Sequence, residues 1–176
     1  MGQSKKYGYY IAGFTDGEGS FNVSLIKRKD YAEKWKIVAS FNISQRDKTI
    51  LLFIKRFLCC GTLRQRKDGV IYYEVTKIAD LQKKIIPFFQ NFQFLSSNKK
   101  RNFSIFAKIV NLLYKKEHLT PRGFKKIIQL RENLNEGRGR KRKYSLKDVL
   151  KIEESPETIR KNLLKKSRKI RYSPIS

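Results

Sequence analysis

The sequence is poor in the side chains that most enzymes use for acid–base and metal chemistry. It contains one histidine, His118, and two cysteines, Cys59 and Cys60, which are adjacent in the chain. A zinc or histidine-based site needs more ligands than this, and adjacent cysteines are poorly placed for an ordinary disulfide. We therefore expect both cysteines to be small packing residues in a reducing compartment. The chemistry that remains is that of carboxylates, lysine, arginine, glutamine and a bound metal ion.

Acidic residues are also scarce, with 15 Asp+Glu against 41 Lys+Arg in 176 residues and a formal net charge of +26. Self-repulsion at that charge destabilises a compact state unless a polyanion binds, and nucleic acid is the leading candidate. The chain has no run of about 18 apolar residues that could span a membrane. It also lacks the apolar and small-residue pattern of a signal peptide. We expect neither a membrane nor a small-molecule substrate as partner.

Two of the few acids, Asp16 and Glu18, stand among glycines at the end of a helix predicted over residues 7–17. Glycine costs a helix interior about 1 kcal/mol relative to alanine, so several in succession suggest that close packing compensates. Small residues recur four positions apart on this helix and so lie near one face. We expect that face to be an interface between two backbones, formed by Gly8, Ala12, Gly13 and Gly17.

The rest of the chain alternates between strand and helix patterns. Period-two alternation predicts strands over 20–28, 35–44, 62–67 and 70–76, the last two joined as a hairpin. Apolar residues at helical spacing predict helices over 48–58, 78–89, 98–115 and 121–134, with Pro87 marking strain or an early end of the 78–89 helix. The order indicates an α+β fold, αββαββα, with an antiparallel four-stranded sheet. We place the core at residues 1–136 and a basic C-terminal helical extension at 137–176, where Ser145 and Ser155 can start two small helices.

The stretch around the acid pair resembles the signature of the LAGLIDADG homing endonucleases. The matching residues are Ile11-Ala12-Gly13-Phe14-Thr15-Asp16-Gly17-Glu18-Gly19, followed by Ser20-Phe21. Three later stretches are similar to the family as well, namely Phe41 to Gln45, Lys99 to Phe103, and His118 to Asn135. The resemblance covers about residues 7–145 and agrees with the predicted element order. A chain with one such motif is expected to act as a homodimer.

The resemblance implies roles for individual residues. Glu18 matches the family's Mg²⁺ ligand, with the Gly17 backbone carbonyl as a candidate second ligand. Gln45 matches a residue that orients solvent near the scissile phosphate. Lys99 matches a basic residue that stabilises charge or polarises water, with Lys100 as the alternative register. Two weaker candidates complete the set, Asp16 as a metal ligand or a support of the helix end, and Lys48 as a further cation of the pocket.

The chemistry of phosphodiester cleavage leads to a similar arrangement. The reaction needs an activated water and neutralisation of charge at the phosphate, which a divalent metal supplies when histidines are lacking. One Glu18 carboxylate per chain provides too few protein ligands for a metal site. If two copies of the 7–17 helix pack along a two-fold axis, their Glu18 carboxylates meet, and two close carboxylates repel unless a cation lies between them.

The polar face of the predicted sheet is the expected DNA surface, because such a face can enter the major groove and read base edges. Its members are Asn22, Ser24, Arg28, Lys36, Ser40, Asn42, Arg64, Arg66, Tyr72 and Glu74. In the basic extension, Arg138, Arg140 and Arg142 are expected to contact phosphates, which position a protein without reading sequence.

These observations predict a Mg²⁺-dependent, site-specific double-strand DNA endonuclease that cleaves a long pseudo-palindromic site as a homodimer. Three alternatives share the basic composition: an intron RNA maturase, a DNA-binding regulator of the same fold that does not cut, and a ribosome-associated protein. The abundance of lysine, isoleucine and asparagine suggests an AT-rich organellar genome, so we expect the protein in a chloroplast or mitochondrion.

Overall fold

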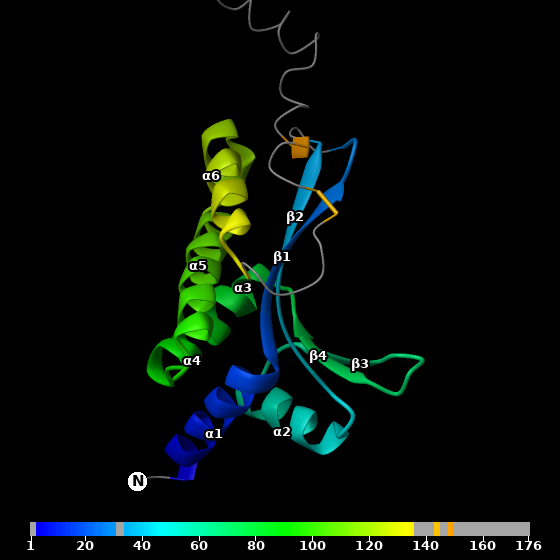
Figure 1. The fold of residues 1–176 in the computed structure, drawn as a ribbon, viewed down its shortest axis with the longest axis vertical. Coiled ribbons are helices and arrows are strands. Elements are labelled where there is room, and N and C mark those ends of the chain that lie inside the picture. Colours follow the sequence, from blue (N-terminus) through cyan, green and yellow to red (C-terminus); the bar gives the residue numbers. More distant parts are fainter. Residues whose placement is uncertain (1–2, 31–33, 136–142, 145–147, 150–176) are drawn as a thin grey trace, which may run out of the picture. The chain divides into compact units, whose positions relative to one another are not determined.

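A computed structural model of the chain describes residues 3–30, 34–135, 143–144 and 148–149 (Figure 1). The chain divides into two compact units, residues 1–139 and 140–176. All elements named below belong to the first unit. Arg138, Arg140 and Arg142 lie outside the described residues, as do Ser145 and Ser155, so the predictions for the basic extension stay predictions.

The first unit is an α+β fold, as predicted. Its sheet has four antiparallel strands in the order β1-β2-β4-β3. Helix α1 precedes the strands, α2 interrupts them, and the remaining helices follow them (Figure 1). The elements through the sheet are α1 Gln3–Glu18, β1 Gly19–Lys27, β2 Trp35–Gln45, α2 Lys48–Leu58, β3 Thr62–Gln65 and β4 Ile71–Val75. Those that follow are α3 Ile78–Asp80, a π-helical turn Leu81–Ile85, α4 Ile86–Asn91, α5 Ser97–Tyr114, a 3₁₀ turn Glu117–Leu119 and α6 Pro121–Glu132.

One face of the sheet is buried because alternate strand residues are large and apolar. Phe21, Phe41, Ile43 and Tyr73 are each at most 1% exposed. They form one hydrophobic cluster with buried residues of α1, α2, α4, α5 and α6, so the helices cover this face. Most of the other strand positions are polar and lie on the opposite face, which leaves that face open for binding.

The segment after β4 differs from the predicted single helix over 78–89. It runs on to Asn91 and contains the π-helical turn Leu81–Ile85 just before Pro87. Proline cannot donate to the preceding turn and its ring crowds the carbonyl there, and a wider turn accommodates both effects. Of the two predicted effects of Pro87, strain or an early end of the helix, the early end was therefore wrong, because the helical segment continues to Asn91.

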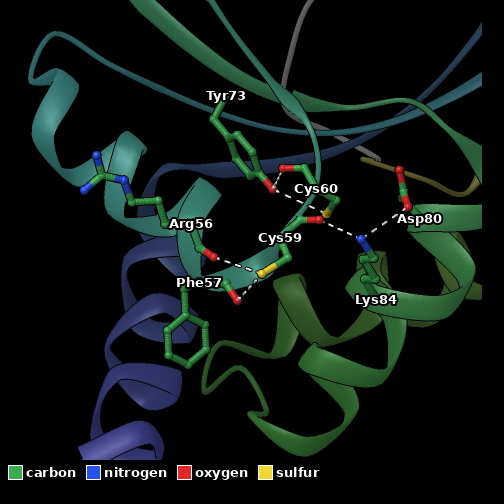
Figure 2. Close-up of polar contacts among 7 residues, drawn as sticks. All are labelled: Arg56, Phe57, Cys59, Cys60, Tyr73, Asp80 and Lys84. Carbon is green, nitrogen blue, oxygen red and sulfur yellow. Dashed lines mark hydrogen bonds and ion pairs between the residues drawn. The ribbon is translucent and has the colours of Figure 1, made fainter.

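The two cysteines lie where α2 ends, as Figure 2 shows. Cys59 is exposed and has a left-handed backbone with φ of 51°, and its Sγ donates to the Arg56 carbonyl over 3.1 Å. Cys60 is half-buried, its carbonyl accepts a hydrogen bond of 3.1 Å from the Tyr73 hydroxyl, and burial raises the pKa of its thiol. Cys60 thus packs as expected, whereas Cys59 does not.

Lys84 links this helix end to the π-helical turn. Its Nζ donates to the Cys59 carbonyl over 2.6 Å and lies 3.7 Å from an Asp80 carboxylate oxygen (Figure 2). A cation at the carbonyl end of a helix complements the helix dipole, so the contact favours the observed end of α2.

Within the described residues, no helix combines the length and the hydropathy that crossing a membrane requires.

Candidate active site

Helix α1 runs directly into strand β1, and this junction carries the predicted acid. Glu18 is the last residue of α1 and is exposed, while Gly19 is the first residue of β1 and is buried. A Cβ on Gly19 would lie 2.7 Å from the Thr15 carbonyl oxygen, so only glycine fits this tight passage from helix to strand. An acid at the carboxyl end of a helix opposes the helix dipole. Its placement there therefore calls for a role other than helix stability.

Asp16 connects the end of α1 to the start of α5. Its carboxylate accepts hydrogen bonds from the backbone N–H of Leu95 at 3.1 Å, the backbone N–H of Ser96 at 2.9 Å, and the Ser96 hydroxyl. Burial alone would raise the pKa of Asp16, but the hydrogen bonds from Ser96 and Leu95 and the charge of Lys99 lower it below its ordinary value. We call this set of contacts the Asp16–Ser96 clamp.

The clamp leads directly to Lys99. Ser96 is the N-cap of α5, and its Oγ accepts a hydrogen bond of 3.3 Å from the Lys99 backbone N–H. The Lys99 ammonium in turn donates to the Gly19 carbonyl over 2.5 Å. The lysine is therefore held at both its backbone and its side chain, beside the α1–β1 junction.

The electrostatics of Lys99 agree with this position. Burial lowers the pKa of the Lys99 ammonium, and the nearby carboxylates of Asp16 and Glu18 oppose that shift. Lys100 is exposed and lines a separate pocket with Phe94 and Phe103. Of the two candidate registers, Lys99 is the one that the fold brings to the acids.

Gln45 reaches the junction through the register of the sheet. Ile43 pairs with Gly19, and Gln45 lies two residues further along β2, where the paired strand gives way to α1. Its side-chain oxygen accepts a hydrogen bond of 2.9 Å from the Arg46 backbone N–H. Lys48 is exposed in the first turn of α2.

The four small residues of α1 were predicted to share one face. The structure instead divides them between two faces. Gly8 and Ala12 point into the protein, where Ala12 is 2% exposed and a Cβ on Gly8 would overlap the Phe92 ring. Assigning these two residues to an interface between chains was therefore wrong, because the chain's own core already covers them. Gly13 and Gly17 are exposed, and a Cβ on either would meet no atom within 4 Å.

The predicted DNA-binding residues within the strands lie on the open face of the sheet. Register places Asn42 between Ser20 on β1 and Glu74 on β4, and Asn22 opposite Ser40. The Asn22 amide donates to the Ser20 hydroxyl over 3.0 Å. The remaining predicted DNA-binding residues on this face are Ser24, Lys36, Arg64 and Tyr72. Of these, Tyr72 is half-buried and the others are exposed.

Two of the predicted DNA-binding arginines lie in hairpin connections, because β1 ends one residue earlier and β3 ends two residues earlier than predicted. Arg28 follows β1 and its Nε donates to the Asp30 carboxylate over 2.8 Å. Arg66 follows β3, donates to the Tyr72 hydroxyl over 2.7 Å and lies 3.2 Å from an Asp68 carboxylate oxygen. Both guanidinium groups are thus oriented by side chains of their own hairpins.

Sequence reasoning missed the Ser96 hydroxyl and the Gly19 carbonyl as parts of the site. A serine just before a helical pattern is an N-cap signal and could have identified Ser96 as the start of α5. Its pairing with Asp16, which is 80 residues away, had no local signal.

A single chain offers few metal ligands. Across the residues that the structure describes, no three His, Cys, Asp or Glu side chains come together as a metal site. Because the clamp engages the carboxylate of Asp16, the acid left for a metal at the junction is Glu18. The donor set therefore fits a divalent cation only if a second copy of the junction contributes to it.

The family of the chain follows from comparisons with known proteins. The family model for LAGLIDADG endonuclease matches residues 11–110. A protein of Neurospora crassa named as a probable intron-encoded endonuclease is 33% identical over 147 residues, which cover 81% of this chain and 32% of that protein. The alignment includes less than a third of the relative's length, so it characterises only part of that protein.

Solved structures with the same fold include one chain of similar length to this one and one that is longer. The homing endonuclease I-TnaI is 28% identical with a TM-score of 0.72, over 82% of this chain and 95% of that chain. The meganuclease I-SmaMI, bound to cleaved DNA, is 31% identical with a TM-score of 0.71, over 75% of this chain and 45% of that chain. Together with the junction geometry, these matches show that the chain belongs to the LAGLIDADG endonuclease family.

Proposed function

We propose that the protein is a homing endonuclease that cuts both strands of a long, pseudo-palindromic DNA site as a homodimer in the presence of Mg²⁺. The observation that carries the proposal is the junction of α1 and β1. There an exposed acid, Glu18, ends the helix within electrostatic reach of a half-buried lysine, Lys99, at one end of a polar sheet face.

The homodimer rests on the open face of α1. Gly13 and Gly17 leave a strip of backbone uncovered. A second copy of α1 can approach that strip closely, as small residues allow. Tyr10, which is 53% exposed and precedes Gly13 by three residues, would lose water on the same contact. Because Glu18 ends this helix, a two-fold axis along the strip brings the two Glu18 carboxylates together.

Magnesium fits the donor set that results. Two carboxylates and water are ligands that Mg²⁺ accepts, and the cation removes the repulsion between the acids. When bound, Mg²⁺ would neutralise phosphate charge and favour ionisation of a water molecule. Glu18 would hold the metal, and the backbone carbonyl of Gly17 is the proposed additional ligand.

The other residues of the site act on the phosphate and the solvent. The Lys99 ammonium, held by the Gly19 carbonyl and by the N-terminal turn of α5, is placed to stabilise charge that develops on a phosphate oxygen. Gln45 would orient the attacking water with its amide group. Asp16 acts at one remove, because its carboxylate holds the start of α5.

Binding to DNA follows from charge and from the shape of the sheet. The strand residues of the open face would read base edges in the major groove, and the surrounding lysines and arginines would bind phosphates. We expect log K to fall by about 0.9 per neutralised phosphate as log salt concentration rises. The names of several relatives describe intron-encoded proteins, which supports the proposal that the gene lies within an organellar intron.

The substitution Glu18→Gln tests the proposal. It keeps the size of the side chain but removes the charge that would hold the metal, so we expect cleavage of a selected duplex to stop while binding remains. A matched control is Glu117→Gln, which removes an acid at the 3₁₀ turn and should leave cleavage unchanged. Full-rate cutting by Glu18→Gln would contradict the metal assignment.

Two further measurements separate the proposal from its alternatives. The mass of the protein on its DNA, from ultracentrifugation, should correspond to two chains per site, and one chain per site would exclude a shared Glu18 pair. A regulator would bind the selected duplex without cutting it in Mg²⁺. An RNA maturase would prefer folded intron RNA to duplex DNA in direct competition.

A further inference from the structure

Strand β1 carries an apolar side chain where the pattern calls for a polar one. Ile26 occupies an outward position of β1 and is 47% exposed. Among the residues that the structure describes, the other exposed large hydrophobic side chains lie on helices, in the 3₁₀ turn or in the α4–α5 connection. Ile26 is therefore an exposed apolar residue on a surface that is otherwise built to bind a polar partner.

The register of the sheet gives Ile26 an apolar neighbour. Ile26 pairs with Lys36 and Ser24 pairs with Val38, so Ile26 and Val38 are diagonal neighbours across β1 and β2. Val38 is half-buried and is not part of the hydrophobic core cluster. Both side chains alternate with the buried residues Leu25 and Ala39 and so lie on the open face.

The surroundings of this pair indicate a polyanionic partner with an apolar group at a defined place. Lys36 lies directly opposite Ile26, Lys27 and Arg28 follow it in the chain, and all three are exposed. The face continues from this pair through Asn22, Ser40 and Asn42 toward the junction. In the major groove of duplex DNA, the apolar group on the base edges is the C5-methyl of thymine.

We propose that Ile26, supported by Val38, contacts the C5-methyl group of a thymine near the outer end of each half-site. The inference rests on the proposed function and makes the recognition of its DNA target more specific. Ile26 is eight positions beyond Glu18 along an extended strand, or roughly 27 Å at about 3.4 Å per residue. At about 3.4 Å per base along one DNA strand, this length spans at most roughly eight base pairs, so the thymine lies within that distance of the site of cleavage.

The test replaces thymine by deoxyuridine, which removes the methyl group and nothing else. A site is first selected from a randomised duplex library by cleavage with the full chain. Each thymine of that site is then replaced, one symmetric pair at a time, and dissociation constants are measured. Loss of one methyl–isoleucine contact should weaken binding about fourfold, the equivalent of one buried methylene, and about sixteenfold for the symmetric pair.

Two protein variants assign the effect to the residue. With Ile26→Ser, the same deoxyuridine pair should cost nothing further, because the apolar partner is already gone. The control Leu119→Ser changes a side chain that is 62% exposed in the 3₁₀ turn outside the sheet, and it should retain the full loss. Since both side chains are exposed, both variants should melt close to wild type, which a thermal scan checks.

The possible outcomes are distinct. The inference is supported if deoxyuridine at the outer position weakens binding by the wild-type and Leu119→Ser proteins but not by Ile26→Ser. Specific cleavage with no such position, or with a loss that persists in Ile26→Ser, overturns the inference and leaves the proposed function intact. A chain that selects no duplex at all overturns the proposed function and this inference with it.

Discussion

The Asp16–Ser96 clamp makes a quantitative prediction, because one carboxylate holds two segments that are distant in the sequence. The substitution Asp16→Ala removes the acceptor of three hydrogen bonds, from two backbone N–H groups and the Ser96 hydroxyl. It leaves the core of the protein untouched. The expected result is a folded protein of lower stability in which the start of α5, and with it Lys99, is less firmly placed.

The size of the effect follows from the kind of contact. Hydrogen bonds to a charged group contribute about 1.5–3 kcal/mol net, and solvent near a partly exposed site reduces this. We expect Asp16→Ala to lower the free energy of unfolding by about 2 kcal/mol. For Ser96→Ala, which removes the N-cap of α5, we expect a loss of about 1 kcal/mol. The double variant should lose less than the sum, because both substitutions break the same contact.

The pH dependence provides an independent reading of the same carboxylate. The folded-state pKa of Asp16 lies below its ordinary value of 3.8. Its contribution to stability is thus fully present above about pH 4, the unfolded-state pKa, and is lost as pH falls through the folded-state pKa. The stability difference between wild type and Asp16→Asn should therefore narrow below pH 4 and stay constant above it.

The assays are urea unfolding for stability and single-turnover cleavage for function. If the clamp positions Lys99, the cleavage rate of bound DNA should fall in Asp16→Ala while the dissociation constant for DNA stays close to wild type. Equal stability of Asp16→Ala and wild type, with no coupling to Ser96→Ala, would refute the reasoning. So would a loss of stability that leaves the cleavage rate unchanged, since the clamp would then have no role in placing Lys99.

Two further predictions compare neighbouring residues. Gly8→Ala should lose about 1–3 kcal/mol of stability, because its Cβ overlaps the Phe92 ring. Gly13→Ala should leave the single chain as stable as wild type or up to about 1 kcal/mol more stable, yet weaken association of two chains. Thermal melting and ultracentrifugation separate these effects, and equal association by Gly13→Ala would contradict the proposed interface. Lys99→Met should stop single-turnover cleavage while Lys100→Met retains it, and the reverse result would exchange their assigned roles.

Much of the fold could be predicted from the sequence because its signals are local. Alternation marked all four strands, and the predicted α2 agrees with Lys48–Leu58 because Asp47 caps its start, where the Asp47 carboxylate accepts from the Thr49 N–H. The π-helical turn could not be predicted, since apolar spacing does not distinguish it from a regular helix.

The candidate site was harder to predict because its contacts join distant parts of the chain. Spacing alone placed Gly8, Ala12, Gly13 and Gly17 near one face, but which of them lies inward depends on where Phe92 packs, and that is a tertiary contact. For the same reason, the sequence pointed to support of the helix end by Asp16 without indicating Ser96 as the partner.

The absence of any linker between α1 and β1 has a consequence for how fast the protein would cut a mismatched DNA site. Under the proposed function, the strand that reads the DNA and the helix that ends in Glu18 are one continuous stretch of backbone. A mismatched site that displaces β1 would therefore also displace the acid, and a misplacement of about 1 Å can slow a reaction by roughly a hundredfold. The protein would then discriminate between DNA sites by the rate of the chemical step. It would do so even where a mismatched site binds almost as tightly as the correct target.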